Sequence, residues 1–273
     1  MIQWIDTHTH IYMQPSIQEQ EDCMRRTLEA GVHKLILAGV DLDSVKPILD
    51  FCKRHSAHAF PSIGLHPTEV KENFKEVLFS LQTSLEENLQ GKQGAYCCQA
   101  DNPIYRAIGE IGMDLYWDKT SLDAQKQAFR LQIQWAKKYD LPLILHIRNA
   151  FEEAIAILKE EQNGSLHGVF HCYSGSYEQA VRAINLGFYL GIGGVLTFKN
   201  SHLPETVEKI GLEHLVLETD APFLAPHPYR GKPNESSYLP LIGYKMAEIK
   251  HCAPERVSEI TNANASTLFK IGE

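Results

Sequence analysis

Two histidines near the start of the chain, His8 and His10, have the type and spacing of metal ligands. They follow a short apolar run and are separated by one residue. Side chains two positions apart on a β-strand point to the same side, so both imidazoles can bind one ion. Taken alone, the pair fits two solvated histidines at a strand end equally well.

Four more residues of metal-ligand type stand at the ends of later apolar runs: Glu110, His146, His171 and Asp220. When parallel strands close into a barrel, the C-terminal ends of all strands meet on one face. A chance explanation requires four unrelated strand ends to carry the same chemistry. The pattern therefore predicts one metal centre, whereas most other histidines fall on expected helices or loops and are interpreted as surface residues.

The elements that must position these ligands are short apolar or β-branched runs that alternate with longer helical patterns. We expect eight strands, at 3–6, 34–38, 59–63, 105–109, 142–146, 169–171, 188–191 and 215–217. Eight strands and eight crossovers in a chain of this length are typical of a (β/α)₈ TIM barrel. An open Rossmann sheet fits less well, because no GxGxxG loop follows the first strand.

Helical patterns fill the spaces between the expected strands. Residues 122–139 form the clearest helix, with apolar residues at helical spacing that include Ala128, Leu131, Trp135 and Ala136. Ser176 and Gln179 form a capping box that opens another helix. Two closing helices are expected at 236–251 and 254–271. We interpret 90–103 as an insertion in a loop and residues 1–273 as a single α/β domain.

Composition and charge restrict the class of protein. A chain of 273 residues with 44% hydrophobic and 22% charged content is ordinary globular material with a sizeable core. A formal net charge of -8 argues against a protein that coats nucleic acid through a basic surface. It does not exclude an enzyme that engages a few nucleotides, because a bound metal adds positive charge.

The sequence shows no signal for export or membrane insertion. The N-terminal residues lack a basic region followed by an apolar stretch, and no apolar run approaches the roughly 20 residues of a membrane helix. The six cysteines include no CxxC pair, and we expect them to be reduced. We therefore expect a cytoplasmic protein with no membrane association and no obligate protein partner.

Several motifs resemble, in the same order, those of the TatD family of metal-dependent deoxyribonucleases. The matching runs are DTHTH from Asp6, GLHP from Gly64, GEIGMD from Gly109, LH from Leu145, FHCYSG from Phe170 and LETDAP from Leu217. The run YRGKPNE from Tyr229 resembles the family's Arg-Gly-Lys-x-Asn-Glu loop, and 264–269 resembles its C-terminal helix. The departures are Ser236 and Ser237, where proline and alanine are usual, and the length of 90–103.

The resemblance implies two divalent ions of the Mg, Mn or Zn type. It assigns three ligands to one ion, namely His8, His10 and Asp220. It assigns His146 and His171 to the second ion, with Glu110 as the bridge between the two. Related barrel hydrolases often use a modified lysine as the bridge, but the two oxygens of a glutamate can span ions about 3.5 to 4 Å apart.

Such a pair of ions predicts hydrolysis of phosphodiester bonds by a metal-activated water, with both ions clamping the attacking and leaving oxygens. Three carboxylates would carry the chemistry: Asp220 as proton acceptor from the water, Glu110 as the bridge, and Glu218. Glu218 either assists the metals or only orients a histidine. Asp114 is expected behind the ligands or, alternatively, on a surface loop.

The expected substrate is DNA, as single strands or 3′ ends, and the family resemblance favours a 3′–5′ exonuclease. Four residues are candidates for substrate contacts: His66, Arg230, Tyr173 and Ser174. His66 can donate to a phosphate oxygen and Arg230 can bind a phosphate through its planar fork of donors. The Tyr173 ring can stack on a base. A packed turn histidine, an ordinary exposed arginine and a core tyrosine are the alternatives.

Two other functions remain open from sequence. An amide or lactone hydrolase on the same barrel uses the same metal chemistry, since fold does not determine substrate. The loop at 229–235 argues for the nuclease, because an amide hydrolase needs no phosphate-binding arginine there. A catalytically silent binding protein is the second alternative, and the complete set of ligand-type residues argues against it.

Overall fold

A computed structural model describes residues 2–90, 104–116 and 118–272 of the chain. The expected insertion at 90–103 therefore lies, apart from Gln90, outside the described residues. Within the described ranges, no helix has the length and apolar character needed to cross a membrane.

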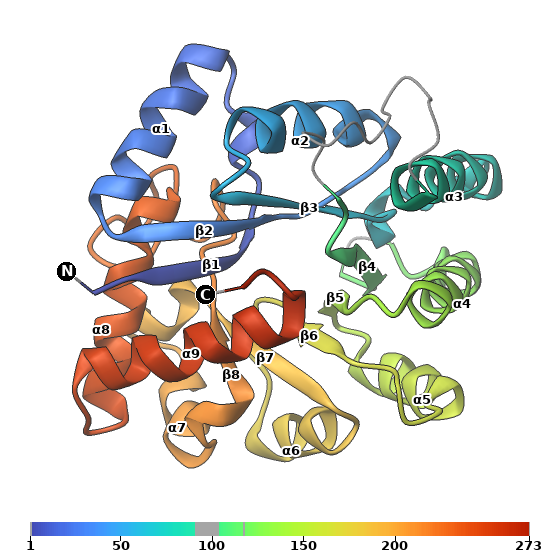
Figure 1. Ribbon diagram of the computed structural model, residues 1–273. Coiled ribbons are helices and arrows are strands. Elements are labelled where there is room, and N and C mark those ends of the chain that lie inside the picture. The colour runs from blue at the N-terminus through green and yellow to red at the C-terminus, as the bar shows by residue number, and fades with distance from the viewer. Residues whose placement is uncertain (1, 91–103, 117, 273) are drawn as a thin grey trace. The chain divides into compact units, whose positions relative to one another are not determined.

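All eight expected strands are present, and each is followed by a helix (Figure 1). The strands are β1 (Trp4–Thr9), β2 (Val32–Leu37), β3 (Ala59–Ile63), β4 (Ala107–Asp114), β5 (Leu143–Arg148), β6 (Gly168–Phe170), β7 (Phe188–Ile192) and β8 (Leu215–Leu217). Their order in the sheet follows their order in the chain. This is the strand order of the predicted (β/α)₈ barrel class.

The helices include the four expected from the sequence, of which the two closing helices are shorter than predicted. They are α1 (Ile17–Glu29), α2 (Leu42–Arg54), α3 (Phe74–Gln90), α4 (Leu122–Tyr139), α5 (Phe151–Glu161), α6 (Tyr177–Asn185), α7 (Leu203–Lys209), α8 (Leu239–Ile249) and α9 (Pro254–Phe269). Short 3₁₀ turns complete the chain: η1 (Ile11–Met13), η2 (Pro67–Glu69), η3 (Gly194–Thr197), η4 (Leu212–His214) and η5 (Ser236–Tyr238). The predicted capping box of Ser176 and Gln179 opens α6.

Two strands continue at least three residues further than the sequence pattern predicted. β1 runs on to Thr9 and β4 runs on to Asp114, and all residues of both strands are buried. The prediction that Glu110 follows the fourth strand is therefore wrong, because Glu110 lies within it. Polar residues and glycines interrupt the apolar pattern of β4, although its backbone continues to pair with β5.

The chain forms two compact units, residues 1–37 with 171–273 and residues 38–170. The interpretation of 1–273 as one domain stays a prediction. In the first unit, β8 returns to β1: the Thr7 hydroxyl donates to the Leu217 carbonyl oxygen at 3.0 Å. Helix α9 packs on both strands, and the Asn262 side chain accepts from the Ile5 N–H at 3.1 Å.

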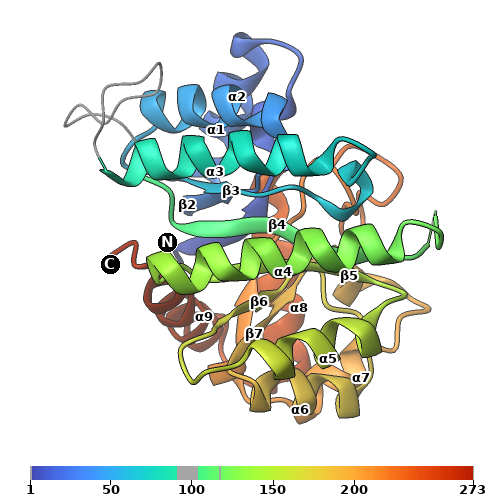
Figure 2. The same cartoon turned by 90° about the vertical axis from the view of Figure 1, so that its right-hand side faces the viewer.

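The second unit consists of β3 to β6 and the helices α2 to α5. Helices α3, α4 and α5 lie side by side outside the strands (Figures 1 and 2). The α4 residues Phe129 and Ile133 are fully buried against the strands. Leu131, which was expected on the same apolar face, is 44% exposed, because its position on the helix turns it away from that face.

Candidate metal centre

The first unit brings together three of the predicted ligands, His8, His10 and Asp220. The Nε2 atoms of the two histidines are 3.2 Å apart, and each lies 3.5 Å from Oδ1 of Asp220. Both histidines are buried, and the Asp220 side chain is 13% exposed. Three donor atoms of this kind that converge on one point form a suitable site for a divalent ion.

The backbone around Asp220 is shaped for this role. Asp220 has a φ of 58°, in the left-handed region, which non-glycine residues adopt rarely and often at functional sites. Its N–H donates to the His8 carbonyl oxygen at 2.9 Å, and its own carbonyl accepts from the Phe223 N–H at 2.8 Å. These bonds hold the carboxylate beside the two histidines.

The charge of Asp220 is maintained by its surroundings. Burial by itself would raise the pKa of this carboxyl. A hydrogen bond from His10 and the positive charge that His171 and His8 can carry outweigh burial, and the pKa is lowered overall. Asp220 is therefore an anion at neutral pH, as a metal ligand must be.

His171, predicted as a ligand of a second ion, lies in the same unit as this cluster. Its ring stacks on that of His8 with centroids 3.7 Å apart, and its Nδ1 is 3.1 Å from Oε1 of Glu218. Glu218 is fully buried, and its Oε2 has no hydrogen-bond partner among the described residues. A Cβ on Gly191 would lie 2.1 Å from that oxygen, so a larger residue there would displace the carboxylate. A buried carboxylate oxygen in this state fits a site that binds a cation.

The second unit holds the other predicted ligands, Glu110 and His146. Oε1 of Glu110 is 2.8 Å from Nδ1 of His146, and Nε2 of His146 is 3.0 Å from Oδ2 of Asp114. Asp114 is buried and accepts from the Tyr116 N–H at 2.8 Å through its other oxygen. The alternative that Asp114 is a surface loop residue is therefore wrong. It is the carboxylate that orients the His146 ring.

His66 lies beside Glu110 and His146, and its Nε2 is 3.4 Å from Oε1 of Glu110. The distances alone would allow His66 to be a metal ligand. However, its Nδ1 accepts a hydrogen bond from the Thr68 N–H at 3.2 Å, so a neutral His66 carries its proton on Nε2. A protonated Nε2 is a donor, which agrees with the predicted contact to a phosphate oxygen better than with metal ligation.

The loop at 229–235 is anchored next to Asp220 by Asn234, for which the sequence predicted no role. Asn234 is fully buried, and its side-chain amide donates to the carbonyl oxygens of Thr219 at 2.7 Å and Phe223 at 2.6 Å. Arg230 is exposed, and its guanidinium lies 4.3 Å above the Phe198 ring. The family motif alone indicated Asn234, without showing what it binds.

Tyr173 and Ser174, which lie shortly after His171 in the chain, were expected to contact substrate. Ser174 is exposed, whereas Tyr173 is 5% exposed and donates its hydroxyl proton to the Ser176 carbonyl oxygen. A buried ring has no free face on which a base can stack. The prediction of stacking by Tyr173 is therefore wrong, and the core tyrosine that we considered as the alternative is what the structure shows.

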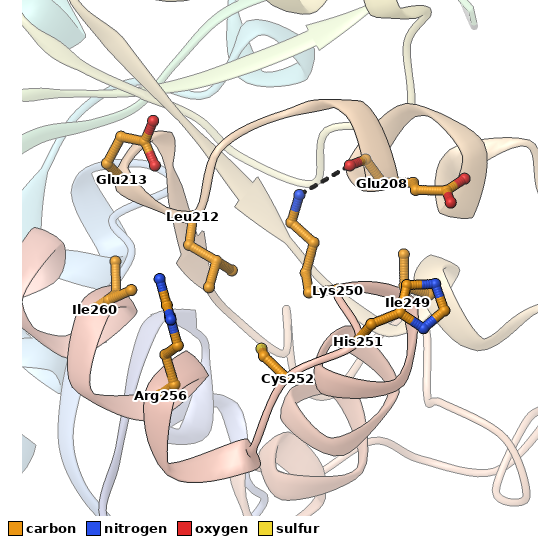
Figure 3. Close-up of a pocket in the computed structure, with 9 residues that line it drawn as sticks. All are labelled: Glu208, Leu212, Glu213, Ile249, Lys250, His251, Cys252, Arg256 and Ile260. Atoms are coloured by element: carbon orange, nitrogen blue, oxygen red, sulfur yellow. Dashed lines mark hydrogen bonds between the residues drawn. The ribbon is translucent and has the colours of Figure 1, made fainter.

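A pocket elsewhere in the first unit does not share this chemistry (Figure 3). Its volume is about 410 Å³, and both acidic and basic side chains line it, among them Glu208, Glu213 and Arg256. The Lys250 ammonium at its edge donates to the Glu208 carbonyl oxygen at 3.0 Å. Glu213 precedes β8, whereas Asp220 follows it, so this pocket lies at the opposite end of the strand from the ligand cluster.

Comparison with known proteins identifies the family. The family model described as TatD related DNase matches residues 5–270. The chain belongs to the TatD family. Among TatD-family relatives, the metal-dependent hydrolase YabD of Bacillus subtilis is 35% identical over 97% of this chain and 98% of its own length. The 3′-5′ ssDNA/RNA exonuclease TatD of Salmonella typhimurium is 29% identical over 93% of this chain and 94% of its own length.

A solved structure of the TatD family agrees with these matches. The crystal structure of YjjV, a TatD homolog from Escherichia coli, superposes with a TM-score of 0.88 at 29% identity and covers 98% of both chains. The (β/α)₈ fold class and a metal-dependent hydrolase of the TatD family are therefore confirmed. The histidine and carboxylate clusters described above are its candidate metal-binding residues.

Proposed function

We propose that this TatD-family hydrolase is a deoxyribonuclease that cleaves phosphodiester bonds in DNA with the help of two divalent ions. The observation that carries the proposal is the convergence of His8, His10 and Asp220 on one point, with a second histidine and carboxylate cluster on β4 and β5. The Salmonella relative whose name describes a 3′-5′ exonuclease favours action from 3′ ends.

The residues fit two ions of the Mg, Mn or Zn class. His8, His10 and Asp220 would hold one ion, His146 and His171 would hold the other, and Glu110 would bridge them. The buried Glu218 oxygen without a hydrogen-bond partner supports the presence of positive charge near His171. When bound, such ions activate water and neutralise the charge of the phosphate in an in-line displacement.

The side chains supply the remaining steps. Asp220 is ionised and only 13% exposed, so it can accept the proton of a water bound beside it. His66 Nε2 donates to a non-bridging phosphate oxygen, because its other nitrogen is held by the Thr68 N–H. Glu218 fixes His171 through the contact at 3.1 Å. Arg230 and Ser174 contact the strand outside the scissile phosphate.

Metal removal tests this proposal most directly. Purified protein treated with a chelator should lose cleavage of labelled single-stranded DNA, and Mg or Mn should restore it, since no side-chain nucleophile is assigned. Single- and double-stranded substrates labelled at either end would separate exonuclease from endonuclease action. Undiminished cleavage after verified metal removal would contradict the mechanism, and hydrolysis of an amide or lactone but not of DNA would contradict the substrate.

A further inference from the structure

A second arginine stacks on an aromatic ring at the end of a strand, and it lies beside the cluster of Glu110 and His146. The central carbon of the Arg148 guanidinium is 3.6 Å from the centroid of the Tyr116 ring. Arg148 is the last residue of β5 and stands two positions after His146. The two side chains therefore point to the same side of the strand.

Backbone pairing holds the stacked residues in register with the cluster. Asp114 pairs with Arg148 across β4 and β5, and the Leu115 N–H donates to the Arg148 carbonyl oxygen at 2.9 Å. The Tyr116 N–H donates to one oxygen of Asp114, whose other oxygen faces His146. The stack is thus fastened to the same carboxylate that orients a candidate metal ligand.

The chemistry of the stack suits an anionic strand. Tyr116 is 51% exposed and Arg148 is exposed as well. An aromatic ring stacks on the flat face of a guanidinium, whereas a phosphate binds the N–H donors at the edge of the guanidinium plane. Arginine next to an exposed aromatic ring is a recurrent feature of channels for single-stranded nucleic acid.

The same arrangement occurs in the first unit, where Arg230 lies over Phe198. We propose that Arg148 binds a backbone phosphate of the DNA strand adjacent to the phosphate that is cleaved. Tyr116 is a positioning residue that keeps the guanidinium in the orientation for this contact. This inference rests on the proposed nuclease function and extends it, because it names a second phosphate subsite at the end of β5.

The test compares a single-stranded oligonucleotide with bis(p-nitrophenyl) phosphate, which has no neighbouring phosphate. Losing a charge-assisted hydrogen bond of this kind lowers kcat/KM by about tenfold to 100-fold. For Arg148→Ala the loss on the oligonucleotide should exceed the loss on the small substrate by at least about tenfold, mainly through KM. The slope of log kcat/KM against log salt should become shallower by about 0.7, as expected for one phosphate contact on a single strand.

Further variants separate binding from folding. Arg148→Lys should have a salt dependence of kcat/KM between those of Arg148→Ala and the wild type. Tyr116→Phe should have a lower KM than Tyr116→Ala, because phenylalanine still stacks on the guanidinium. Arg54→Ala is the matched control: Arg54 lies 5.5 Å from the Phe51 ring on α2 and should behave like the wild type. Metal content and circular dichroism of each variant show whether the centre and the fold are intact.

The outcomes distinguish this inference from the proposed function. If the wild type cleaves the oligonucleotide and Arg148→Ala cleaves it with the same KM and salt slope, the inference of a second phosphate subsite is wrong. The proposed nuclease function would be unaffected by that result. Equal losses on both substrates, or loss of metal, would assign Arg148 to the centre or the fold instead. A wild type that cleaves no oligonucleotide with any metal overturns the nuclease and this subsite together.

Discussion

The Thr219 hydroxyl donates a hydrogen bond of 2.6 Å to the Asp6 carboxylate, and the Thr219 N–H donates a second bond of 2.9 Å. Asp6 also accepts from the His8 N–H at 3.2 Å. One fully buried carboxylate thus links the strand that carries His8 to the residue before Asp220. Burial raises the pKa of Asp6 from 3.8 to about 7, although these hydrogen bonds act in the opposite direction.

Asp6→Asn should remove a pH-dependent destabilisation of the metal-free protein. Between pH 4 and 7 the unfolded chain releases the Asp6 proton while the folded chain retains it, so folding weakens as the pH rises. A pKa difference of this size corresponds to on the order of 4 kcal/mol above pH 7. Urea unfolding in chelator should show the wild type losing stability relative to Asp6→Asn from pH 4.5 to 8. A constant difference would mean that Asp6 titrates at its ordinary pKa.

Glu110→Ala should bind clearly less metal than His8→Ala. If Glu110 bridges two ions, its removal leaves their mutual repulsion uncompensated, whereas removal of His8 affects one site. Activity of Glu110→Ala should fall by several orders of magnitude. The measurement is metal content per chain, with circular dichroism as the control and Glu110→Gln as a variant that preserves shape. Two ions per chain and near-normal turnover in Glu110→Ala would rule out the bridge.

Asp114→Ala should weaken metal binding about tenfold to 100-fold, the usual effect of losing a carboxylate that orients a histidine ligand. Asp114 faces Nε2 of His146 at 3.0 Å and fixes which nitrogen carries the proton. Competition with a chromogenic chelator measures the affinity. Asp123→Ala is the control, since Asp123 is exposed in the first turn of α4. Equal metal affinities in Asp114→Ala and Asp123→Ala would show that Asp114 does not support metal binding.

Arg230→Ala should reduce cleavage of oligonucleotides far more than cleavage of bis(p-nitrophenyl) phosphate. Its guanidinium is expected to contact a phosphate away from the metals, and the lost bond should cost on the order of 1.5 to 3 kcal/mol. Steady-state kinetics on both substrates measure the difference. Arg25→Ala serves as the control, because Arg25 is paired with Glu29 on the surface of α1. Similar losses on both substrates would assign Arg230 to the chemistry or the fold.

Local signals in the sequence determined the elements and the residue types of the site. The strands at 59–63 and 215–217 and helix α4 have the bounds that their apolar patterns predicted. Such patterns predict the elements because one face of a helix or strand packs on the apolar core, so apolar residues recur at the spacing of that element. The chemical types at the strand ends, and the family motifs that contain them, were sufficient to predict a metal-dependent hydrolase.

The tertiary structure decided how those residues act. The proton position on His66 depends on the Thr68 backbone, and Tyr173 is excluded from substrate by its burial. Burial raises the pKa of Asp6 and the hydrogen bonds from Thr219 oppose it, and the Arg148 guanidinium stacks on Tyr116. Contacts across more than 200 residues, as between Asp6 and Thr219, leave no periodic pattern in the sequence. Protonation, burial and orientation are set by such neighbours, which come together only when the chain folds.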